Sequence, residues 1–574
     1  MIEQGTALAP QGDVTFTGVN SRLRAALLPP GWVADAKNCR FTDGTPRTRD
    51  GFFIMSFTNT GGGAAPTAVS GFQGIGVFKD PTDTRWIVFA ANGATYYCRP
   101  GTMARAIALP AGVSISGETV EFVQCMDVLI MLRGTASAPL VLDDVTTAWR
   151  TISMLTNDPA FAPENPTDGT EDIPNAVWGL AMQNRLFLPD ASQGPDIMVA
   201  SDFLNYTRYQ PTLGAFRVNQ GDDEGIVAAF PIPTPDDTPA SAMAIFKERS
   251  IYIVSNIVGD LSALSLGDVT TEYSAACRRA IWRVGRDVWF VAAGRGVSSI
   301  TQTTQNKWQG VDVPVSRDIQ PLIDRINWDA SAKIRAVKVG NLSYIAAPID
   351  GATANNCIIV FDHLNGAWAG YDTGVAVQEF VTFNYEGVDR LFIWTTSGYC
   401  GLYEEGNKDD VSGTASASNS ITTSLTTRGY AVQLGRQRAE KFTLQLRTFN
   451  PRYTITVQEE GHRETQTLVS AKTKSRTAYY LPHMKAPWVN SNTNDDHGTA
   501  YRQDYSLDWT VSVSLGSNGI DLSAKQETTE RYRVPRSSRG QAVQFVLSND
   551  RGSMDLHGVE VQSTQVDKRK GVFA

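Results

Sequence analysis

Cysteine and histidine are scarce in this sequence and are not clustered. Its 574 residues include six cysteines and five histidines. No C-x-x-C pair occurs and no two histidines have metal-ligand spacing, so a zinc site or a compact disulfide framework is not expected. We predict reduced, mostly buried thiols. The cysteines are Cys39, Cys98, Cys125, Cys277, Cys357 and Cys400, and the histidines are His363, His462, His483, His497 and His557.

Long apolar runs and targeting signals are also missing. The first ten residues, MIEQGTALAP, lack the charged start and the apolar core of a signal peptide. No apolar run approaches the roughly 20 residues that a membrane-spanning helix needs. The sequence therefore predicts a protein without a signal peptide or a membrane span, folded in a cytoplasm.

The chain has no overall excess of positive charge. Its formal net charge is -8 and its pI is near 5.4. Because proteins bind phosphates through Lys and Arg, this balance argues against a chain that grips nucleic acid over its whole surface. The residues from Arg531 onward carry more basic than acidic groups. We therefore expect a contact surface there whose charge is opposite in sign to that of the chain as a whole.

The usual catalytic motifs are absent. There is no G-x-x-x-x-G-K-[ST] loop and no G-x-S-x-G elbow. Ser201 and Asp202 loosely match the S-x-D-x-G-x-x-W turn of sialidases, but their spacing is wrong and the glycine and tryptophan are missing. We interpret two acidic stretches, Asp222–Glu224 and Asp495–His497, as surface turns. The sequence predicts no catalytic, cofactor-binding or metal-ligating residue.

A repeated hairpin pattern is what the sequence does contain. In Ile358–Asp372 an apolar strand ends at an aspartate, an Asn-Gly turn follows, and an Ala-Trp pair opens a second strand. Asn-Gly supplies the positive φ angles of a tight hairpin. Val141–Trp149 has Asp and Ala-Trp at the same offsets, which indicates an internal repeat. The structural markers of this repeat are Asp143, Trp149, Asp362 and Trp368.

Two further segments keep part of this pattern. Gln302 and Trp308 have the spacing without the aspartate, and Asp202 and Asn205 have the turn without the tryptophan. We interpret both as incomplete copies of the same hairpin.

Short apolar strands recur about every 50 residues, which is the period of a four-stranded propeller blade. Continuous apolar runs of this kind predict strands buried on both faces, as in blades that pack face to face. The fold class that we predict is all-β, a β-propeller of seven blades, or alternatively six, with an additional antiparallel β-sandwich or platform. The seven strands are residues 86–90, 128–132, 186–188, 251–254, 288–291, 343–346 and 391–394.

Three regions follow from these patterns. Residues 1–66 are an N-terminal segment that packs on the platform and closes the propeller, and residues 67–405 are the propeller. Residues 406–574 are the platform, because period-two alternation at 442–446, 453–457 and 505–515 indicates sheets with one buried face. Strands at Val543–Leu547 and Val559–Val561 complete this sandwich, and residues 481–504 form a polar excursion from it.

Two insertions interrupt the propeller. The stretch 157–175 has four prolines and five acidic residues, and 221–224 with 231–239 forms a second insertion. Long polar loops between strands are usually surface decoration or partner contacts. The arginines of Gly18–Gly51 are interpreted as surface or interface groups rather than catalytic ones.

Taken together, these features resemble the propeller-bearing tail nozzle proteins of short-tailed bacteriophages, including proteins that stabilise packaged DNA. The resemblance rests on the Asp–Trp hairpins and on three stretches of sequence. These are Asn38–Phe53, which begins NCRFTDGTPRTRDGF, Val284–Ile300 (VGRDVWFVAAGRGVSSI) and Arg531–Val561 (RYRVPRSSRGQAVQFVLSNDRGSMDLHGVEV). None of them is a catalytic signature.

The resemblance implies a structural virion protein in the phage tail, not an enzyme. It implies a ring, for which we expect six copies, below the portal and adaptor proteins, with tail fibres or a needle outside. Genomic double-stranded DNA would be retained by this ring and would leave through it without sequence-specific binding. Two alternatives are a tail-tip, receptor-binding adhesin, suggested by loop 157–175, and a polysaccharide-cleaving propeller hydrolase, which would need two facing carboxylates.

Overall fold

The computed structural model describes most of the chain between residues 6 and 566. The residues left out within that span are 8, 56–67, 103, 154–169, 211–213, 233–241, 258–260, 310–312, 413–417, 432–435, 450–451, 460–464, 474–476, 479–502, 505–511, 514–519, 522–525, 535–538 and 541. Nearly all regular structure in the described residues is β-strand. No helix in this part of the chain is long and apolar enough to cross a membrane.

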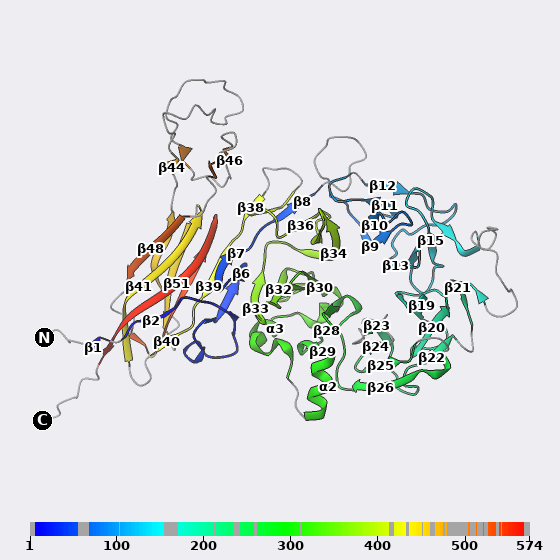
Figure 1. Ribbon diagram of the computed structural model, residues 1–574, viewed down its shortest axis with the longest axis horizontal. Coiled ribbons are helices and arrows are strands. Elements are labelled where there is room, and N and C mark those ends of the chain that lie inside the picture. The colour runs from blue at the N-terminus through cyan, green and yellow to red at the C-terminus, as the bar shows by residue number, and fades with distance from the viewer. Residues whose placement is uncertain are drawn as a thin grey trace, which may run out of the picture.

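Seven antiparallel sheets follow one another along the described chain and are arranged in a ring (Figure 1). We name them blades 1 to 7. Blades 1 and 2 are β9 (Phe72–Lys79), β10 (Arg85–Ala91), β11 (Ala94–Cys98) and β12 (Arg105–Ile107), then β13 (Glu121–Cys125), β14 (Val128–Leu132), β15 (Leu140–Leu142) and β16 (Arg150–Thr151). Blade 3 is β17 (Thr170–Glu171), β18 (Leu180–Met182), β19 (Arg185–Pro189), β20 (Ile197–Asp202), β21 (Asn205–Tyr209) and β22 (Ala215–Arg217).

The remaining four blades complete the ring. Blade 4 is β23 (Ile226–Ile232), β24 (Ala242–Lys247), β25 (Ile251–Ser255) and β26 (Ser265–Thr270), and blade 5 is β27 (Ile281–Val284), β28 (Asp287–Ala292) and β29 (Gly296–Ser299) followed by helix α2 (Ile300–Gln309). Blade 6 is β30 (Arg335–Val339), β31 (Leu342–Ala347), β32 (Cys357–Asp362) and β33 (Ala367–Asp372). Blade 7 is β34 (Val377–Tyr385), β35 (Val388–Thr395) and β36 (Cys400–Tyr403), with β8 (Phe52–Ile54) as its fourth strand. Its first strand contacts β9, which closes the ring.

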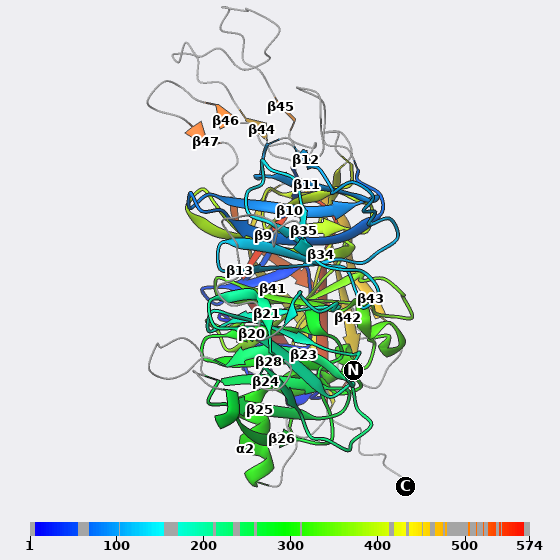
Figure 2. The ribbon, with the colours of Figure 1, turned by 90° about the vertical axis from the view of Figure 1, so that its right-hand side faces the viewer.

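The predicted apolar strands lie on seven different blades. Five of them are the second strand of their blade in chain order, 186–188 lies on β19 beside the edge strand β18 of blade 3, and 251–254 is the third strand of blade 4. All five residues of β14 are buried, as expected for a strand covered on both faces. In Figure 2 the blades are seen edge-on and their strands run across the view. The prediction of an all-β propeller is confirmed.

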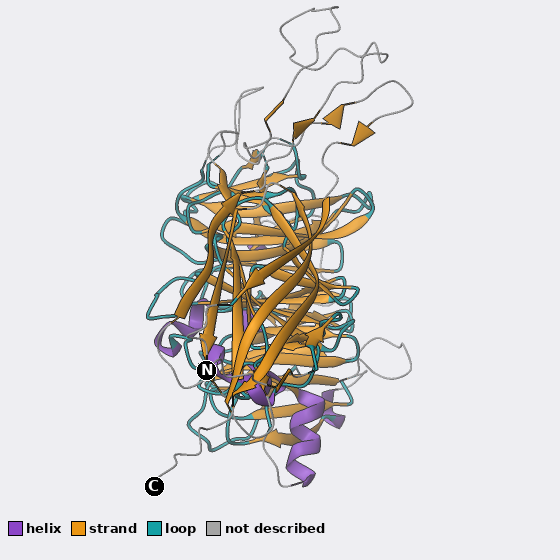
Figure 3. Cartoon of the chain, turned by 90° about the vertical axis from the view of Figure 1, so that its left-hand side faces the viewer, coloured by secondary structure: helices purple, strands orange, loops and turns teal. Residues whose placement is uncertain are grey.

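The C-terminal part forms two stacked sheets beside blades 6 and 7, which we call the platform. Its strands are β39 (Thr423–Thr426), β40 (Tyr430–Ala431), β41 (Arg436–Phe449), β42 (Arg452–Glu459), β43 (Thr465–Thr473), β48 (Gln526–Arg533), β49 (Arg539–Gly540), β50 (Ala542–Asn549) and β51 (Ser553–Val566). The two strands that precede them, β37 (Lys408–Asp410) and β38 (Ser418–Ser420), extend the sheet of blade 7 beyond β8. The ring of Phe442 on β41 stacks on that of Phe545 on β50, with centroids 3.8 Å apart. The two sheets therefore share an apolar core, and their long strands cross in front of the blade strands in Figure 3.

Two short strand pairs lie outside these sheets. They are β44 (Thr477–Ala478) with β45 (Gln503–Asp504), and β46 (Ser512–Val513) with β47 (Ile520–Asp521). The predicted alternation at 505–515 and the polar excursion 481–504 fall almost entirely outside the described residues.

The N-terminal segment divides its strands between the propeller and the platform. The strands β1 (Thr6–Ala7), β2 (Gln11–Asp13), β6 (Cys39–Thr42) and β7 (Thr45–Thr48) join the sheet of β41, β48 and β51, while β3 (Gly18–Val19) and β4 (Trp32–Val33) pair with each other. The strand β5 (Asp35–Lys37) pairs with β33 of blade 6 on one side and with β39 on the other. One ten-stranded sheet therefore runs from the propeller into the platform.

Candidate functional site: buried charges between propeller and platform

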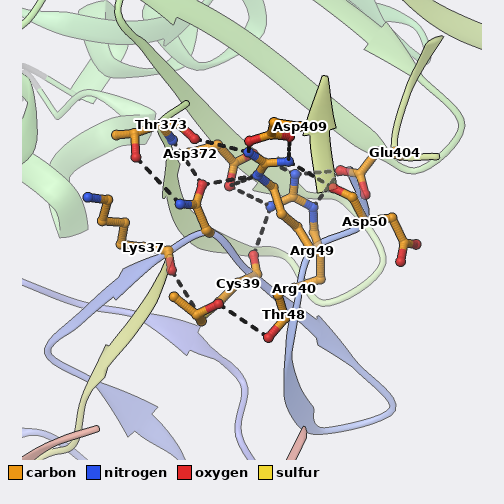
Figure 4. Close-up of polar contacts among 12 residues, drawn as sticks. Lys37, Cys39, Arg40, Thr48, Arg49, Asp50, Asp372, Thr373, Glu404 and Asp409 are labelled. Carbon is orange, nitrogen blue, oxygen red and sulfur yellow. Dashed lines mark hydrogen bonds and ion pairs between the residues drawn. The ribbon is translucent and has the colours of Figure 1, made fainter. Parts of the chain in front are cut away.

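Two arginines of the N-terminal segment enter the junction between the propeller and the platform. Arg40 lies on β6 and Arg49 follows β7. Both are buried, at 5% and 2% exposure, so of the two alternatives, surface or interface, they are interface groups, whereas Arg22, Arg24 and Arg47 of the same stretch are exposed. They meet three carboxylates that come from the ends of β33 and β36 and from β37 (Figure 4). These carboxylates are Asp372, Glu404 and Asp409.

Arg40 binds two carboxylates at once. Its Nη1 and Nη2 donate to the two carboxylate oxygens of Asp372 at 3.0 and 2.6 Å, and its Nε donates to Glu404 Oε1 at 2.7 Å. Burial lowers the pKa of Arg40, but Asp372 and Glu404 outweigh it and hold that pKa well above its ordinary value. Arg40 is therefore a permanent cation that joins blade 6 to blade 7.

Arg49 makes the second pair. Its Nη1 and Nη2 donate to the two oxygens of Asp409 at 2.9 and 2.6 Å, and Nη2 also donates to the carbonyl oxygen of Thr373 at 3.0 Å. The guanidinium lies 5.3 Å from the centroid of the Tyr403 ring. A planar guanidinium can make such a two-point contact and stack on a ring at the same time, which lysine cannot.

Asn38 holds the backbone between these groups. Its φ angle is +55°, a conformation that asparagine tolerates better than most residues. Its Oδ1 accepts from Arg49 Nε at 3.0 Å and from the amide of Thr373 at 2.9 Å. Its Nδ2 donates to the carbonyl oxygen of Thr422 at 2.6 Å. One side chain thus connects the N-terminal segment, the end of blade 6 and the start of the platform.

This network is built to hold its parts together rather than to react. Asp372 is 1% exposed and also accepts from Tyr403 Oη at 2.8 Å, so no substrate can reach it. Burial raises the pKa of Glu404 although Arg40 lowers it, and burial raises the pKa of the neighbouring Cys39 thiol. A buried thiol with a raised pKa is a poor nucleophile.

A second charged network lies at the centre of the ring, between the first strands of several blades. Glu121 of β13 accepts from Arg278 Nε and from Arg279 Nη2, both at 3.0 Å. Glu379 of β34 accepts from Arg335 Nε at 2.8 Å, and its Oε2 is 4.0 Å from Arg279 Nε. Because these residues belong to blades 2, 6 and 7 and to the connection that enters blade 5, the network ties opposite sides of the ring.

The pKa of Glu121 is shifted in the opposite direction to that of a glycosidase general acid. Burial raises the pKa of Glu121, but Arg278 and Arg279 outweigh it and the net pKa is lowered. A general acid in a glycosidase needs a raised pKa instead. Among the described residues, no group of three His, Cys, Asp or Glu is placed to hold a metal ion.

The marker tryptophans hold neighbouring blades together. Trp149 donates from Nε1 to Thr95 Oγ1 of blade 1 at 2.8 Å. Trp368 donates from Nε1 to the carbonyl oxygen of Val315, after blade 5, at 3.3 Å. Trp149 lies just before the fourth strand of blade 2 and Trp368 lies on the fourth strand of blade 6, so each reaches back to structure that precedes its own blade.

The marker aspartates organise the turns. Asp143 accepts from Arg150 at 2.6 Å, and the two oxygens of Asp362 accept from the amide of Leu364 at 2.8 Å and from Asn365 Nδ2 at 2.7 Å. The hairpin interpretation of Gln302 and Trp308 is wrong, because these residues lie in helix α2 and Trp308 is 86% exposed. Blade 5 has this helix where the other blades have a fourth strand.

The other sequence candidates are either ordinary turns or lie outside the described residues. Asp222 forms an ion pair with Lys247, and Asp202 forms one with Arg208. Most of loop 157–175, all of 233–239 and Asp495–His497 fall outside the described residues. The cysteines are free, and all are buried except the partly buried Cys277, as predicted.

No protein-family model and no curated protein matches the chain. Among solved structures, BBS1N in complex with ARL6DN is similar with a TM-score of 0.35 and 10% identity, over 62% of this chain and 96% of that chain. The extracellular domain of the hybrid two-component system BT3049 from B. thetaiotaomicron is similar with a TM-score of 0.36 and 12% identity, over 61% of this chain and 42% of that one. The extracellular domain of the one-component system BT4673 from the same organism gives 0.37 and 11%, over 79% and 59%. None of these likenesses bears on what this chain binds or does.

Proposed function

We propose that this chain is a non-enzymatic, structural virion protein that assembles into a tail nozzle ring through which phage DNA is retained and ejected. The proposal combines the sequence resemblance with the rigid connection of the two parts of the chain. A ring forms when head-to-tail contacts between neighbouring copies return to the first copy, most simply after six copies. The portal and adaptor proteins, tail fibres or a needle, and the genomic DNA are its proposed partners.

The observation that carries the proposal is the continuous sheet through β33, β5 and β39, with Arg40 and Arg49 bound across it. Two domains of one chain usually meet through a modest polar interface and move relative to each other. Here a backbone ladder and buried ion pairs replace such an interface. A nozzle below a pressurised capsid must transmit load without a hinge, and this junction has that property.

The charge networks support a structural role over an enzymatic one. The buried carboxylates at the junction and on the axis are occupied by arginines, and the lowered pKa of Glu121 opposes proton donation at neutral pH. The acidic character of the whole chain also suits a DNA conduit. Like charge keeps DNA from adhering along its path.

The experiment that tests this proposal is immunolabelling of purified virions with an antibody against this chain, imaged in negative stain. We expect label at the tail, below the portal vertex, in particles that carry the protein. Label confined to distal fibres would indicate the adhesin alternative instead. Virions that never carry label would reject the proposal.

A further inference from the structure

The outer face of the platform sheet formed by β48, β41 and β51 is basic, although the chain as a whole is acidic. Along β41 the buried Phe442, Leu444 and Leu446 point to the sandwich core. Alternation therefore places Lys441 and Arg447 on the outer face, where both are exposed. Two further exposed arginines, Arg531 and Arg533, lie on β48 beside them.

The strand register brings these cations close together. Lys441 pairs directly with Arg533, and Thr443 pairs with Arg531. Directly opposed residues have Cβ atoms about 5 Å apart, and alternate residues along a strand are about 7 Å apart. Like charges in opposed positions destabilise a sheet unless something neutralises them. The three cations Lys441, Arg531 and Arg533, which we call the basic corner, therefore favour an anionic partner.

The basic corner has no carboxylate partner of its own among the described residues. Some exposed and half-buried cations of the propeller do have one, as in Arg133 with Glu118 and Arg325 with Asp350. Within the described part of the chain, the side chains of the basic corner and of Arg447 make no ion pair or hydrogen bond.

Acidic groups on the same face are fewer. The exposed carboxylate Glu560 lies opposite Thr443 and accepts from Gln562, and Glu440 accepts from Thr564 at 3.2 Å. Asp555 is buried between Arg447 and Arg47, and Glu527 stands opposite Arg447 in register. The sequence after β51 continues with Lys568, Arg569 and Lys570.

The composition of this face shows whether it suits a protein partner or a partner that carries phosphate groups. Stable protein interfaces have an apolar, often aromatic centre. Among the described residues, no large exposed hydrophobic side chain belongs to β41, β48 or β51, and only Val14 lies at the margin, beside Gly558. The neutral residues of the face, Thr443, Gln445 and Thr529, offer hydrogen bonds of the kind that proteins make to phosphate oxygens.

We propose that the basic corner and the sheet face around it bind the phosphate backbone of duplex DNA without sequence preference. This inference rests on the proposed function, since it assigns DNA retention to one face of the platform. The rest of the acidic surface would leave DNA free to move. Contacts of this kind are weakened by salt because binding releases counterions.

The test uses the full-length protein and a fluorescent 20-base-pair duplex, with anisotropy titrations over a range of KCl concentrations. The test variant is Lys441→Gln/Arg531→Gln/Arg533→Gln. The control is Arg85→Gln/Arg99→Gln/Arg105→Gln, which removes three exposed arginines from blade 1 and changes the net charge equally. Thermal melts of both variants check that they fold as the wild type does.

We expect the test variant to lose at least about tenfold in affinity at low salt. Its slope of log K against log [salt] should be shallower by about 2.7, at about 0.9 per lost phosphate contact. The control variant should keep the wild-type affinity and slope. Wild-type protein without salt-dependent binding, or equal losses in the two variants, would overturn the inference.

Native mass spectrometry of the same proteins separates this inference from the proposed function. Loss of assembly in the test variant alone, without any duplex binding by the wild type, would show that the face contacts an acidic protein surface and would overturn DNA binding. Salt-dependent binding at the basic corner by a protein that never forms a ring would instead support the DNA site and count against the nozzle.

Discussion

Single tryptophans hold adjacent blades of this propeller together. Trp368 is 3% exposed, packs edge-to-face on Phe361 with centroids 4.9 Å apart, and donates to Val315. We expect Trp368→Ala to lower the free energy of unfolding by about 3–5 kcal/mol, because it removes a large buried ring. Urea unfolding measures this. Trp308→Ala, at an exposed site, is the matched control and should change it by less than about 0.5 kcal/mol. Equal effects would show that Trp368 is not a packing residue.

Removing a junction arginine should lower the stability of the protein more than removing a surface arginine. Removing Arg49 leaves Asp409 buried without its partner, so Arg49→Met should cost about 3–5 kcal/mol. Arg452 forms an ion pair with Asp550 in which both side chains are nearly half exposed, so Arg452→Met should destabilise the protein far less than Arg49→Met. Chemical denaturation of both variants provides the comparison. If the double variant Arg49→Met/Asp409→Asn were as unstable as the sum of its single changes, the pair would not be coupled.

A half-buried histidine, His363, gives the protein a specific acid sensitivity. His363 Nε2 is 2.7 Å from Ser343 Oγ, which also accepts from Trp282 Nε1 at 3.0 Å. Burial, with a smaller effect of Lys338, lowers the pKa of His363 from 6.5 to about 4. Between these values the unfolded chain binds more protons than the folded one, so stability falls as the pH falls from 6.5 to about 4.

Replacing this histidine should remove that part of the pH dependence. The unfolding free energy of His363→Gln should change less between pH 6.5 and pH 4 than that of the wild type, whatever its value at neutral pH. Denaturation midpoints at several pH values in this window would show the difference. Parallel pH profiles for the two proteins would contradict the assignment.

Some residues of the site could be found from the sequence and others could not. The spacing of Asp and Trp was sufficient to identify the four repeat markers, since it depends on local hairpin geometry. The partners of Arg40 and Arg49 lie more than 300 residues away along the chain, so no local pattern relates them. Alternation in β6 places Arg40 on the face opposite to Cys39 and Phe41, so the local pattern predicts an exposed arginine there.

At the scale of elements, β8 is the strand that completes blade 7 from the other end of the chain. It pairs with β36 and, at Phe52, with Asp409 of β37. Gly51 precedes it, and a Cβ at this position would overlap the carbonyl oxygen of Lys408. The close approach of β8 to β37 therefore requires glycine.

We expect Gly51→Ala to destabilise the protein by at least about 1–3 kcal/mol, as overpacking of a closed interior does. Gly267 on β26 is the matched control, because it has open space around a Cβ and no positive φ angle. Gly267→Ala should be neutral or slightly stabilising. Thermal melts compare the two. A Gly51→Ala protein as stable as the wild type would show that β8 does not pack closely on β37.

The sequence predicted elements well where local periodicity decides the structure. Five of the seven apolar runs are second strands, and the run at 186–188 has the equivalent place beside the edge strand β18, because that position is covered on both faces. Blade 4 differs because both β24 and β25 are apolar and fully paired, so the run at 251–254 identified the third strand instead. Helix α2 was missed because Ile300–Gln309 has few apolar residues, and its place beside β26 is set by tertiary contacts such as that of Lys307 with Asp268.

At the scale of the whole molecule, the N-terminal segment connects what are otherwise two separate folds. Its strands belong to blade 7, to the sheet shared with blade 6 and to the outer platform sheet. The all-β class and the alternating platform strands could be predicted from sequence, since both follow from residue patterns within single strands. The shared sheet could not, because it depends on pairing between residues far apart, such as Ala36 with Leu425.

The measurement that tests the central claim most directly is the mass and symmetry of the purified protein, by native mass spectrometry followed by electron-microscopy class averages. The account predicts a closed ring, most simply of six copies, with an open axial hole, formed alone or on mixing with a portal assembly. In such a ring each copy should be one rigid body, with propeller and platform at a constant angle. A protein that remains monomeric with and without a portal assembly would contradict the nozzle.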